Sequence, residues 1–309
     1  MNDSKMSIAV LIPCRNEQLT VAPVVTGFRN VLPDSDIYVY DNASTDETVS
    51  NALEAGAIIG FEPKHGKGQV VRKMFADIDA DIYVIVDGDG TYDPSEATLM
   101  LKTFLEEGLD MVAGARTTDS DTSLRRGHNL GNRLFNHLYR FLFGSGFSDI
   151  FTGYRVLSRR LVKSFPAVSS GFEIETELAV HTSQLRLPVT EIPVTYKERP
   201  IGSRSKLRTF RDGLGILRSM ISLLKENRPL FMFGSLSSIC LLTSVALSIP
   251  LVATYAETGL VPRLPTAILT ASLMLLSLLL FASGLILDSI SKARIEAKRI
   301  AYLQHQPSN

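Results

Sequence analysis

The stretch VIVDGDGTYDP, residues 84–94, leads from an apolar run directly into a cluster of acidic side chains. Asp87 and Asp89 stand two residues apart with Gly88 between them, and Asp93 follows. Two carboxylates on a tight turn can both face one hard divalent cation, which in turn can bridge a nucleotide diphosphate and hold its negative charge. Acidic turns after strands are common, so this spacing alone favours a simple surface turn.

Other ligand loops are excluded by particular positions. A calcium-binding hand loop that begins at Asp87 needs glycine at its sixth position and glutamate at its twelfth, where this chain has Tyr92 and Thr98. Residues 60–69, GFEPKHGKGQ, have one residue too many for a P-loop and glycine where serine or threonine must hold magnesium. The first strand is not followed by the glycine fingerprint of a dinucleotide site.

The elements that must position the acids alternate between strand and helix. Buried strands are predicted for residues 8–13, 36–41, 81–87 and 111–115. A helix is predicted for residues 94–108, with Asp93 as a helix-start residue ahead of it. Such alternation predicts an α/β fold with a parallel sheet, which binds ligands at the carboxyl ends of its strands.

Composition excludes several classes of protein. The 309 residues are 45% hydrophobic, enough for a full core, and contain 32 basic and 32 acidic side chains, so no global charge points to a nucleic-acid partner. Cys14 and Cys240 are the only cysteines, which excludes a disulfide framework and fits a reducing compartment. The apolar run at the N-terminus is too short for a signal peptide.

The last third of the chain is predicted to be a membrane hairpin. Residues 229–256 and 264–287 contain no charged side chain, and each run exceeds the ~20 apolar residues that span a bilayer. The basic side chains that flank the hairpin are Lys225, Arg228, Lys292, Arg294, Lys298 and Arg299. The positive-inside rule therefore places the large N-terminal domain and both termini in the cytoplasm.

A basic helix is predicted just before the hairpin. Its apolar residues recur three and four apart at Leu207, Phe210, Leu214, Leu217, Ile221 and Leu224. Arginines and lysines lie off that stripe, which favours a helix in the lipid interface, while packing against the α/β domain stays an equal alternative.

Five motifs follow one another in a recognisable order: IPCRNE, DNASTD, DGD, TGYRVLSR and RPIGSRSK. In this order, over about residues 7–213, the chain resembles the family 2 glycosyltransferases of GT-A fold, within them the dolichyl-phosphate mannose synthase-like branch. The resemblance implies an α/β mixed-sheet catalytic domain and transfer of a sugar from a UDP- or GDP-linked donor to a polyprenyl phosphate at the cytoplasmic membrane face. It also implies Mg²⁺ or Mn²⁺ as cofactor.

The resemblance assigns roles to particular residues. The nucleotide-sugar site comprises Pro13, Arg15, Glu17, Asp41, Asp87, Gly88, Asp89, Arg199 and Lys206. Within it, Asp87 and Asp89 are the metal ligands, and Arg199 and Lys206 belong to a loop that closes on the diphosphate. The acceptor phosphate is assigned to Arg116, Arg126 and Arg133. Asp89, Arg116 and Lys206 are the expected catalytic residues.

The chain departs from the mannose synthases at Thr91, where those enzymes carry glutamine, and in a loop one residue longer, which together favour a UDP-linked sugar. Arg15 stands where the family often has tyrosine. The domains expected are a glycosyltransferase domain at 1–206, an interfacial helix at 207–228, a transmembrane hairpin at 229–288 and a basic tail at 289–309. Partners are the donor, the lipid acceptor and membrane lipid, and a homo-oligomer is left open.

Several polar residues have plain structural interpretations. Asp41 can cap the turn DNASTD. Lys64 and Lys67 are expected in a solvated turn between glycines, with a phosphate contact as the alternative. The acids of residues 171–178 can face either the acceptor or solvent, and Asp149 matches an acid that shapes the acceptor side.

Four alternative functions compete with this expectation. A processive polysaccharide synthase of the same fold would carry an arginine-tryptophan motif, and this chain has no tryptophan. A sugar nucleotidyltransferase would have a glycine-rich first loop in place of IPCRNE. An inactive membrane scaffold is disfavoured by the retained acids and basic residues, and a transferase that acts on another lipid or polysaccharide stays open.

Overall fold

The computed structural model describes residues 6–117, 147–169, 171, 173–199, 221–222 and 224–305. The chain forms two compact units, Met1–Gly213 with Lys298–Asn309, and Leu214–Ala297. The first unit contains an α/β sheet, and the second contains long apolar helices.

Seven strands form one mixed sheet in the first unit. They are β1 (Ile8–Cys14), β2 (Asp36–Asp41), β3 (Ile58–Phe61), β4 (Ile82–Ile85), β5 (Met111–Thr117), β6 (Arg155–Ser158) and β7 (Val189–Thr195). Their order is β3-β2-β1-β4-β6-β5-β7. Strand β6 runs antiparallel to β4 and β5, while every other pair is parallel. The mixed sheet that the resemblance implied is confirmed, and the wholly parallel sheet expected from strand–helix alternation is wrong at β6.

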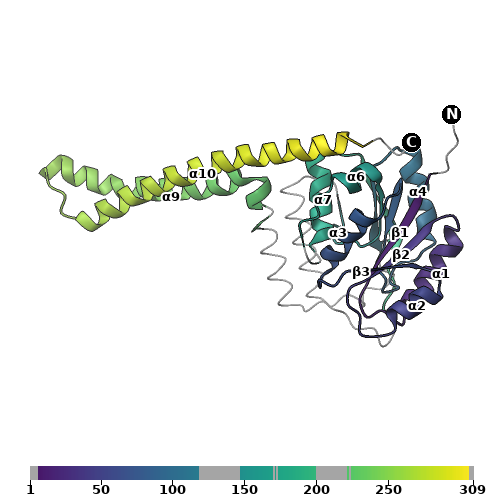
Figure 1. Ribbon diagram of the computed structural model, residues 1–309. Helices are drawn as coiled ribbons and strands as arrows, with labels where there is room; N and C mark the ends of the chain where they lie inside the picture. The colour runs from purple at the N-terminus through teal and green to yellow at the C-terminus, as the bar shows by residue number, and fades with distance from the viewer. Residues whose placement is uncertain are drawn as a thin grey trace. The chain divides into compact units, whose positions relative to one another are not determined.

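Helices cover both faces of this sheet (Figure 1). On one face lie α1 (Val21–Val31), α2 (Thr48–Glu54) and α4 (Glu96–Glu106). On the other lie α3 (Lys67–Asp77), α6 (Arg159–Ser164) and α7 (Ile174–Leu185). The main core fills the space between the sheet and the first group of helices, with Phe28 of α1 and Phe104 of α4 almost completely buried.

The central strand β4 explains why the acidic turn lies where it does. All four of its residues are buried, because β1 and β6 flank it and helices cover both faces. The continuous apolar run that predicted a buried strand is therefore confirmed. The polar residues that follow Ile85 emerge together at the carboxyl end of the strand.

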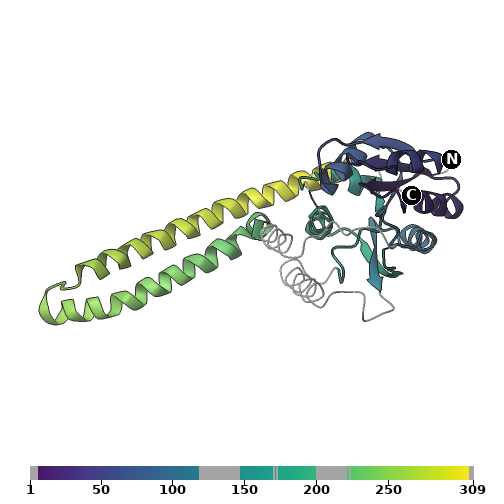
Figure 2. The same cartoon turned by 90° about the horizontal axis from the view of Figure 1, so that it is seen from below.

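The second unit contains α9 (Pro229–Thr258) and most of α10 (Leu264–Leu303). The two helices run side by side (Figure 2), and their contact includes Ser237 Oγ donating to the Ser277 carbonyl at 2.8 Å. Both are long and apolar enough to cross a membrane, with mean hydropathies of 2.1 and 2.2 over their most apolar windows. The segment expected to be a basic tail continues α10 as helix up to Leu303.

Candidate active site

The Asp-Gly-Asp turn is fixed tightly against the neighbouring strand. Gly88 packs so closely on β1 that a Cβ at this position would overlap the Sγ of Cys14. Thr20, just ahead of α1, donates its hydroxyl to the Gly88 carbonyl at 2.7 Å. Glycine is therefore required for close packing here, and the turn presents Asp87 and Asp89 from a rigid base.

Asp89 is a buried carboxylate held by two neighbours. Thr91 donates its hydroxyl to Oδ1 at 2.6 Å, and the Arg199 guanidinium lies 2.5 Å from Oδ2. Asp89 itself is only 4% exposed. Thr91 therefore orients the aspartate that was expected to bind metal.

Arg199 reaches Asp89 because the chain after β7 is tied to the acidic turn. The Lys197 amide donates to the Thr91 carbonyl at 2.8 Å, and Tyr92 forms a β-bridge with Tyr196. The structure thus brings together the second aspartate of the turn and the arginine that the sequence placed on a mobile loop.

Asp87 carries a different cation. Its carboxylate forms an ion pair with Lys67, the first residue of α3, and Lys67 also forms an ion pair with Glu175 of α7. The Lys67 side chain is only 10% exposed, so the solvated turn expected there is wrong at this residue. Burial lowers the pKa of Lys67, but the two carboxylates raise it more, and the residue stays charged. Burial raises the pKa of Glu175, and Lys67 opposes that rise.

The acids of the turn fit a divalent cation that is shared with a substrate. Asp87 keeps 30% of its side chain exposed, and Gly153 opposite leaves space that a Cβ would take from the Asp87 carboxylate. Among the described residues, no group of three or more His, Cys, Asp and Glu side chains can hold a metal by itself. Magnesium is commonly bound by one or two carboxylates together with substrate phosphates and water, and this donor set suits that arrangement.

Arg116 lies at the end of β5 and is paired with Asp149. Its Nε and Nη2 donate to the two carboxylate oxygens at 2.6 and 2.8 Å, a bidentate arrangement that fixes the guanidinium plane. The guanidinium also lies over the ring of Tyr196, 5.4 Å from its centroid. Burial opposes the charge, but Asp149 raises the pKa of Arg116 further, so a cation stays at this strand end.

The residues expected to bind the nucleotide lie on loops that follow β1 and β2. Pro13 is half-buried in β1, Arg15 is exposed, and Glu17 is buried with its amide donating to Thr48 Oγ1 at 2.8 Å. Asp41 is buried and accepts from the Ser44 amide at 3.0 Å, which is the turn-capping bond expected for it. The Asn42 amide donates to the Cys14 carbonyl at 2.9 Å and so joins the two strand ends.

Asn42 has a role that the sequence reasoning missed. Its side chain donates to the carbonyls of Glu62 and Lys64 at 2.8 and 2.7 Å and accepts from the Gly66 amide at 2.8 Å. These bonds shape the turn that leads into Lys67. The sequence signal was the pair of glycines around Lys67, which permit a tight approach to a helix start.

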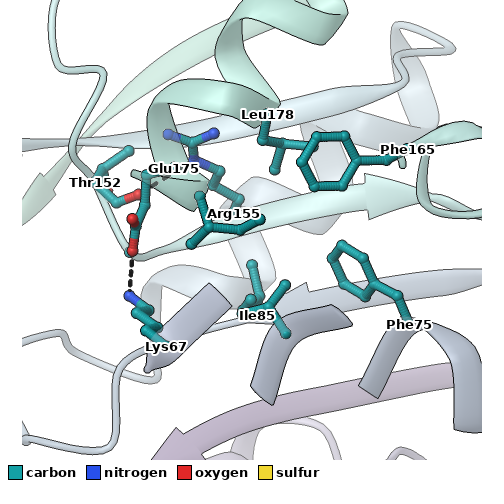
Figure 3. A pocket seen from close by; sticks show the side chains of 11 residues that line it. Lys67, Phe75, Ile85, Thr152, Arg155, Phe165, Glu175 and Leu178 are labelled. Carbon is teal, nitrogen blue, oxygen red and sulfur yellow. Dashed lines mark hydrogen bonds and ion pairs between the residues drawn. The ribbon is translucent and has the colours of Figure 1, made fainter. Parts of the chain in front are cut away.

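A cavity of about 20 Å³ lies behind the Lys67–Glu175 pair. Figure 3 shows Glu175 and Lys67 pointing toward one another at one side, with Phe75, Phe165 and Leu178 forming the apolar side. This volume is near that of one water molecule, so the cavity is no substrate pocket. The ion pair therefore forms the polar side of this small cavity.

Three of the expected site residues, Lys206, Arg126 and Arg133, lie outside the described residues, as does most of the expected interfacial helix. For these the roles assigned from the sequence stay predictions.

Comparison with known proteins defines the class. The model of glycosyl transferase family 2 matches residues 9–165, and the chain belongs to that family. It is 37% identical over 245 residues to the glycosyltransferase AglJ of Haloferax volcanii, a match that covers 79% of this chain and 80% of AglJ.

Other relatives share the fold or are named for lipid phosphates. A dolichyl-phosphate hexose transferase of Haloferax volcanii is 26% identical over 72% of this chain and 95% of its own length. An undecaprenyl-phosphate mannosyltransferase of Micrococcus luteus is 26% identical over 64% of this chain and 86% of its own. The crystal structure of glucosyl-3-phosphoglycerate synthase from Mycobacterium tuberculosis with Mn²⁺, UDP and product superposes with a TM-score of 0.58 at 23% identity, covering 72% of this chain and 79% of that one. This likeness confirms the GT-A type of fold.

Proposed function

We propose that this glycosyltransferase moves a hexose from a nucleotide-sugar to a polyprenyl phosphate at a membrane surface, with inversion at the anomeric carbon. The observation that carries the proposal is the placement of charged side chains at the carboxyl ends of β4 and β5. Asp87 and Asp89 follow the end of β4, and Arg116 lies near the end of β5. Relatives named for dolichyl-phosphate and undecaprenyl-phosphate transfer support the same acceptor class.

The acceptor chemistry explains why cations matter here more than a general base. A phosphate monoester has a second pKa of about 6, so near neutral pH its oxygen is already an anion and no proton needs to be removed. That oxygen forms a bond to the anomeric carbon, while the bond from this carbon to the diphosphate breaks and its electron pair leaves on the diphosphate oxygen.

The chief energetic problem is bringing two anions together. Arginine binds phosphate oxygens in a fork, and Arg116 is held in a fixed plane by Asp149. Asp87 and Asp89 would hold Mg²⁺ or Mn²⁺, which supplies positive charge to the departing diphosphate when bound. The synthase structure with Mn²⁺ and UDP supports this choice of ion and a UDP-linked donor. Arg199 and Lys206 are proposed to contact the same diphosphate, and Arg126 and Arg133 the acceptor phosphate.

Membrane attachment follows from the acceptor. A polyprenyl chain stays in the bilayer, so an enzyme that reacts with its phosphate gains from being anchored there. Helices α9 and α10 are proposed to cross the membrane as a hairpin, with the catalytic unit on the cytoplasmic side, where the flanking basic residues are expected.

One assay tests the function. Membranes that contain the protein are incubated with a panel of radiolabelled UDP- and GDP-sugars, with polyprenyl phosphate or with 3-phosphoglycerate as acceptor. We expect one donor to label the lipid fraction only when polyprenyl phosphate is added. Label in phosphoglycerate and none in lipid would replace the proposed acceptor with a soluble one, and no transfer from any donor would contradict the function.

A further inference from the structure

Lys67 forms ion pairs with two carboxylates, one of which belongs to the acidic turn. One ammonium group lies between Asp87, which is partly open to solvent, and Glu175, whose side chain is 9% exposed. The three groups together carry one net negative charge. Because buried charges are screened weakly, each of them alters the electrostatic potential felt by a cation at Asp87.

Rigid elements hold this arrangement. Lys67 begins α3, an 11-residue helix, and Glu175 lies in the first turn of α7, a 12-residue helix. The Gly68 amide donates to the Gly171 carbonyl at 3.1 Å, which ties the start of α3 to the segment ahead of α7. Asn42 fixes the turn before Lys67 from the end of β2. The ammonium is thus positioned from three directions and remains near Asp87.

A cation so placed competes with a metal for the same carboxylate. Lys67 reduces the negative charge that Asp87 offers, whereas Glu175 draws part of the ammonium's charge away from Asp87. Substitutions of Lys67 and of Glu175 are therefore expected to change the metal affinity of Asp87 in opposite directions. A purely structural ion pair would instead make both single substitutions act alike, by loosening the site.

We propose that Lys67 and Glu175 form a counter-charge pair that sets the affinity of Asp87 for a divalent cation, with Lys67 lowering that affinity and Glu175 raising it. The proposal rests on the proposed function only in placing the metal at Asp87 and Asp89. Its consequence is a cation held weakly enough in the free enzyme that the donor diphosphate completes the site. Lys67 and Glu175 are positioning residues in this account, since they act through Asp87.

The test is Mn²⁺ binding to the full-length protein in detergent, without donor or acceptor, measured as free Mn²⁺ by electron paramagnetic resonance. Lys67→Met is expected to tighten binding roughly tenfold, because a competing charge a few ångströms away is removed. Glu175→Gln is expected to weaken binding, because Lys67 then has Asp87 as its remaining carboxylate partner of the two and competes more strongly with Mn²⁺. The double variant, which restores the net charge, should bind within about threefold of the wild type.

Lys163→Met provides the matched control. Lys163 is also a half-buried lysine, but it donates to the carbonyls of Phe75 and Ile78 at 2.9 and 2.8 Å and forms its ion pair with Asp79, at 3.8 Å, instead of with the acidic turn. Its replacement should leave Mn²⁺ affinity unchanged. Thermal unfolding of each variant is recorded alongside, and Glu175→Gln, which keeps the shape of the side chain, decides the question if Lys67→Met does not fold.

The proposal is overturned if the two single substitutions shift Mn²⁺ affinity in the same direction, or if neither shifts it by more than twofold. Failure of the wild type to bind Mn²⁺ would overturn it as well. These outcomes are separate from the proposed function, because transfer of label to lipid is measured in another assay and would stand or fall independently.

Discussion

Two aspartates at opposite ends of the sheet's strands pair with cationic side chains in different ways. Asp110 lies just ahead of β5 and is completely buried, and its carboxylate accepts bonds from Ser158, from Arg160 and from Tyr302 at 2.6 to 2.9 Å. Asp87 lies beyond the carboxyl end of β4, pairs with one lysine, and remains partly exposed. Both are ion pairs, but only the second leaves carboxylate surface for a ligand.

Solvent exposure and the number of protein partners separate carboxylates that stabilise the fold from those that can bind a ligand. A buried carboxylate whose bonds all go to the protein holds structure in place, and removing it leaves partners unpaired. A carboxylate that faces a gap and shares its cation with a second acid can accept another ion. Asp110, at the amino-terminal ends of the strands, is of the first kind, and Asp87, at their carboxyl ends, is of the second.

The largest effect on stability is expected from Asp110→Ala. The substitution leaves Arg160 and the hydroxyls of Ser158 and Tyr302 without their carboxylate acceptor. Loss of one partner of a buried ion pair lowers the free energy of unfolding by about 3 kcal/mol or more. Asp87→Ala leaves Lys67 paired with Glu175 and should cost about 1 kcal/mol or less. Chemical denaturation of both variants measures the contrast. Equal losses in the free energy of unfolding would contradict the distinction between Asp110 and Asp87.

A smaller and more local effect is expected from Gly153→Ala. The new methyl group overlaps the Asp87 carboxylate and displaces it, which should slow sugar transfer by about 10- to 100-fold. Gly234→Ala is the matched control, because a Cβ there meets no atom within 4 Å. Initial rates at saturating donor measure the effect, and unchanged transfer in Gly153→Ala would show that the position of Asp87 does not matter.

The smallest effect is expected from Tyr302→Phe. This change removes one hydrogen bond of 2.7 Å to Asp110 and keeps the ring on which Arg160 and Arg299 stack. We expect a loss of about 1 kcal/mol in the free energy of unfolding and no change in transfer rate. A matching loss of transfer in the folded protein would mean that the contacts around Asp110 also serve the reaction.

Much of the fold was predictable because apolar runs and turn residues carry local signals. The buried β4 follows from residue type and spacing, as does a helix over residues 94–108, which the structure has as α4 from Glu96 to Glu106. The antiparallel β6 was not predictable in this way, because strand direction depends on pairing with distant strands. Its four buried residues look the same in sequence whichever way they run.

The candidate site was predictable only where a motif carried it. Asp87, Asp89 and Arg199 belong to recognisable motifs, and the structure places Arg199 on Asp89. Lys67 and Glu175 belong to different helices and meet only in the folded chain, so no spacing between them reveals the pair. Asn42 was not singled out either, because its side-chain partners are three backbone groups 20 to 24 residues away.

The most direct test of the central claim is metal-dependent sugar transfer by purified wild type and by Asp89→Ala, with the labelled donor that succeeds in the panel and polyprenyl phosphate. We expect EDTA to abolish labelling of the lipid by the wild type and Mg²⁺ or Mn²⁺ to restore it. Asp89→Ala is expected to lower labelling about 100-fold or more. Lipid labelling that survives both EDTA and the substitution would contradict a metal-assisted transfer at Asp87 and Asp89.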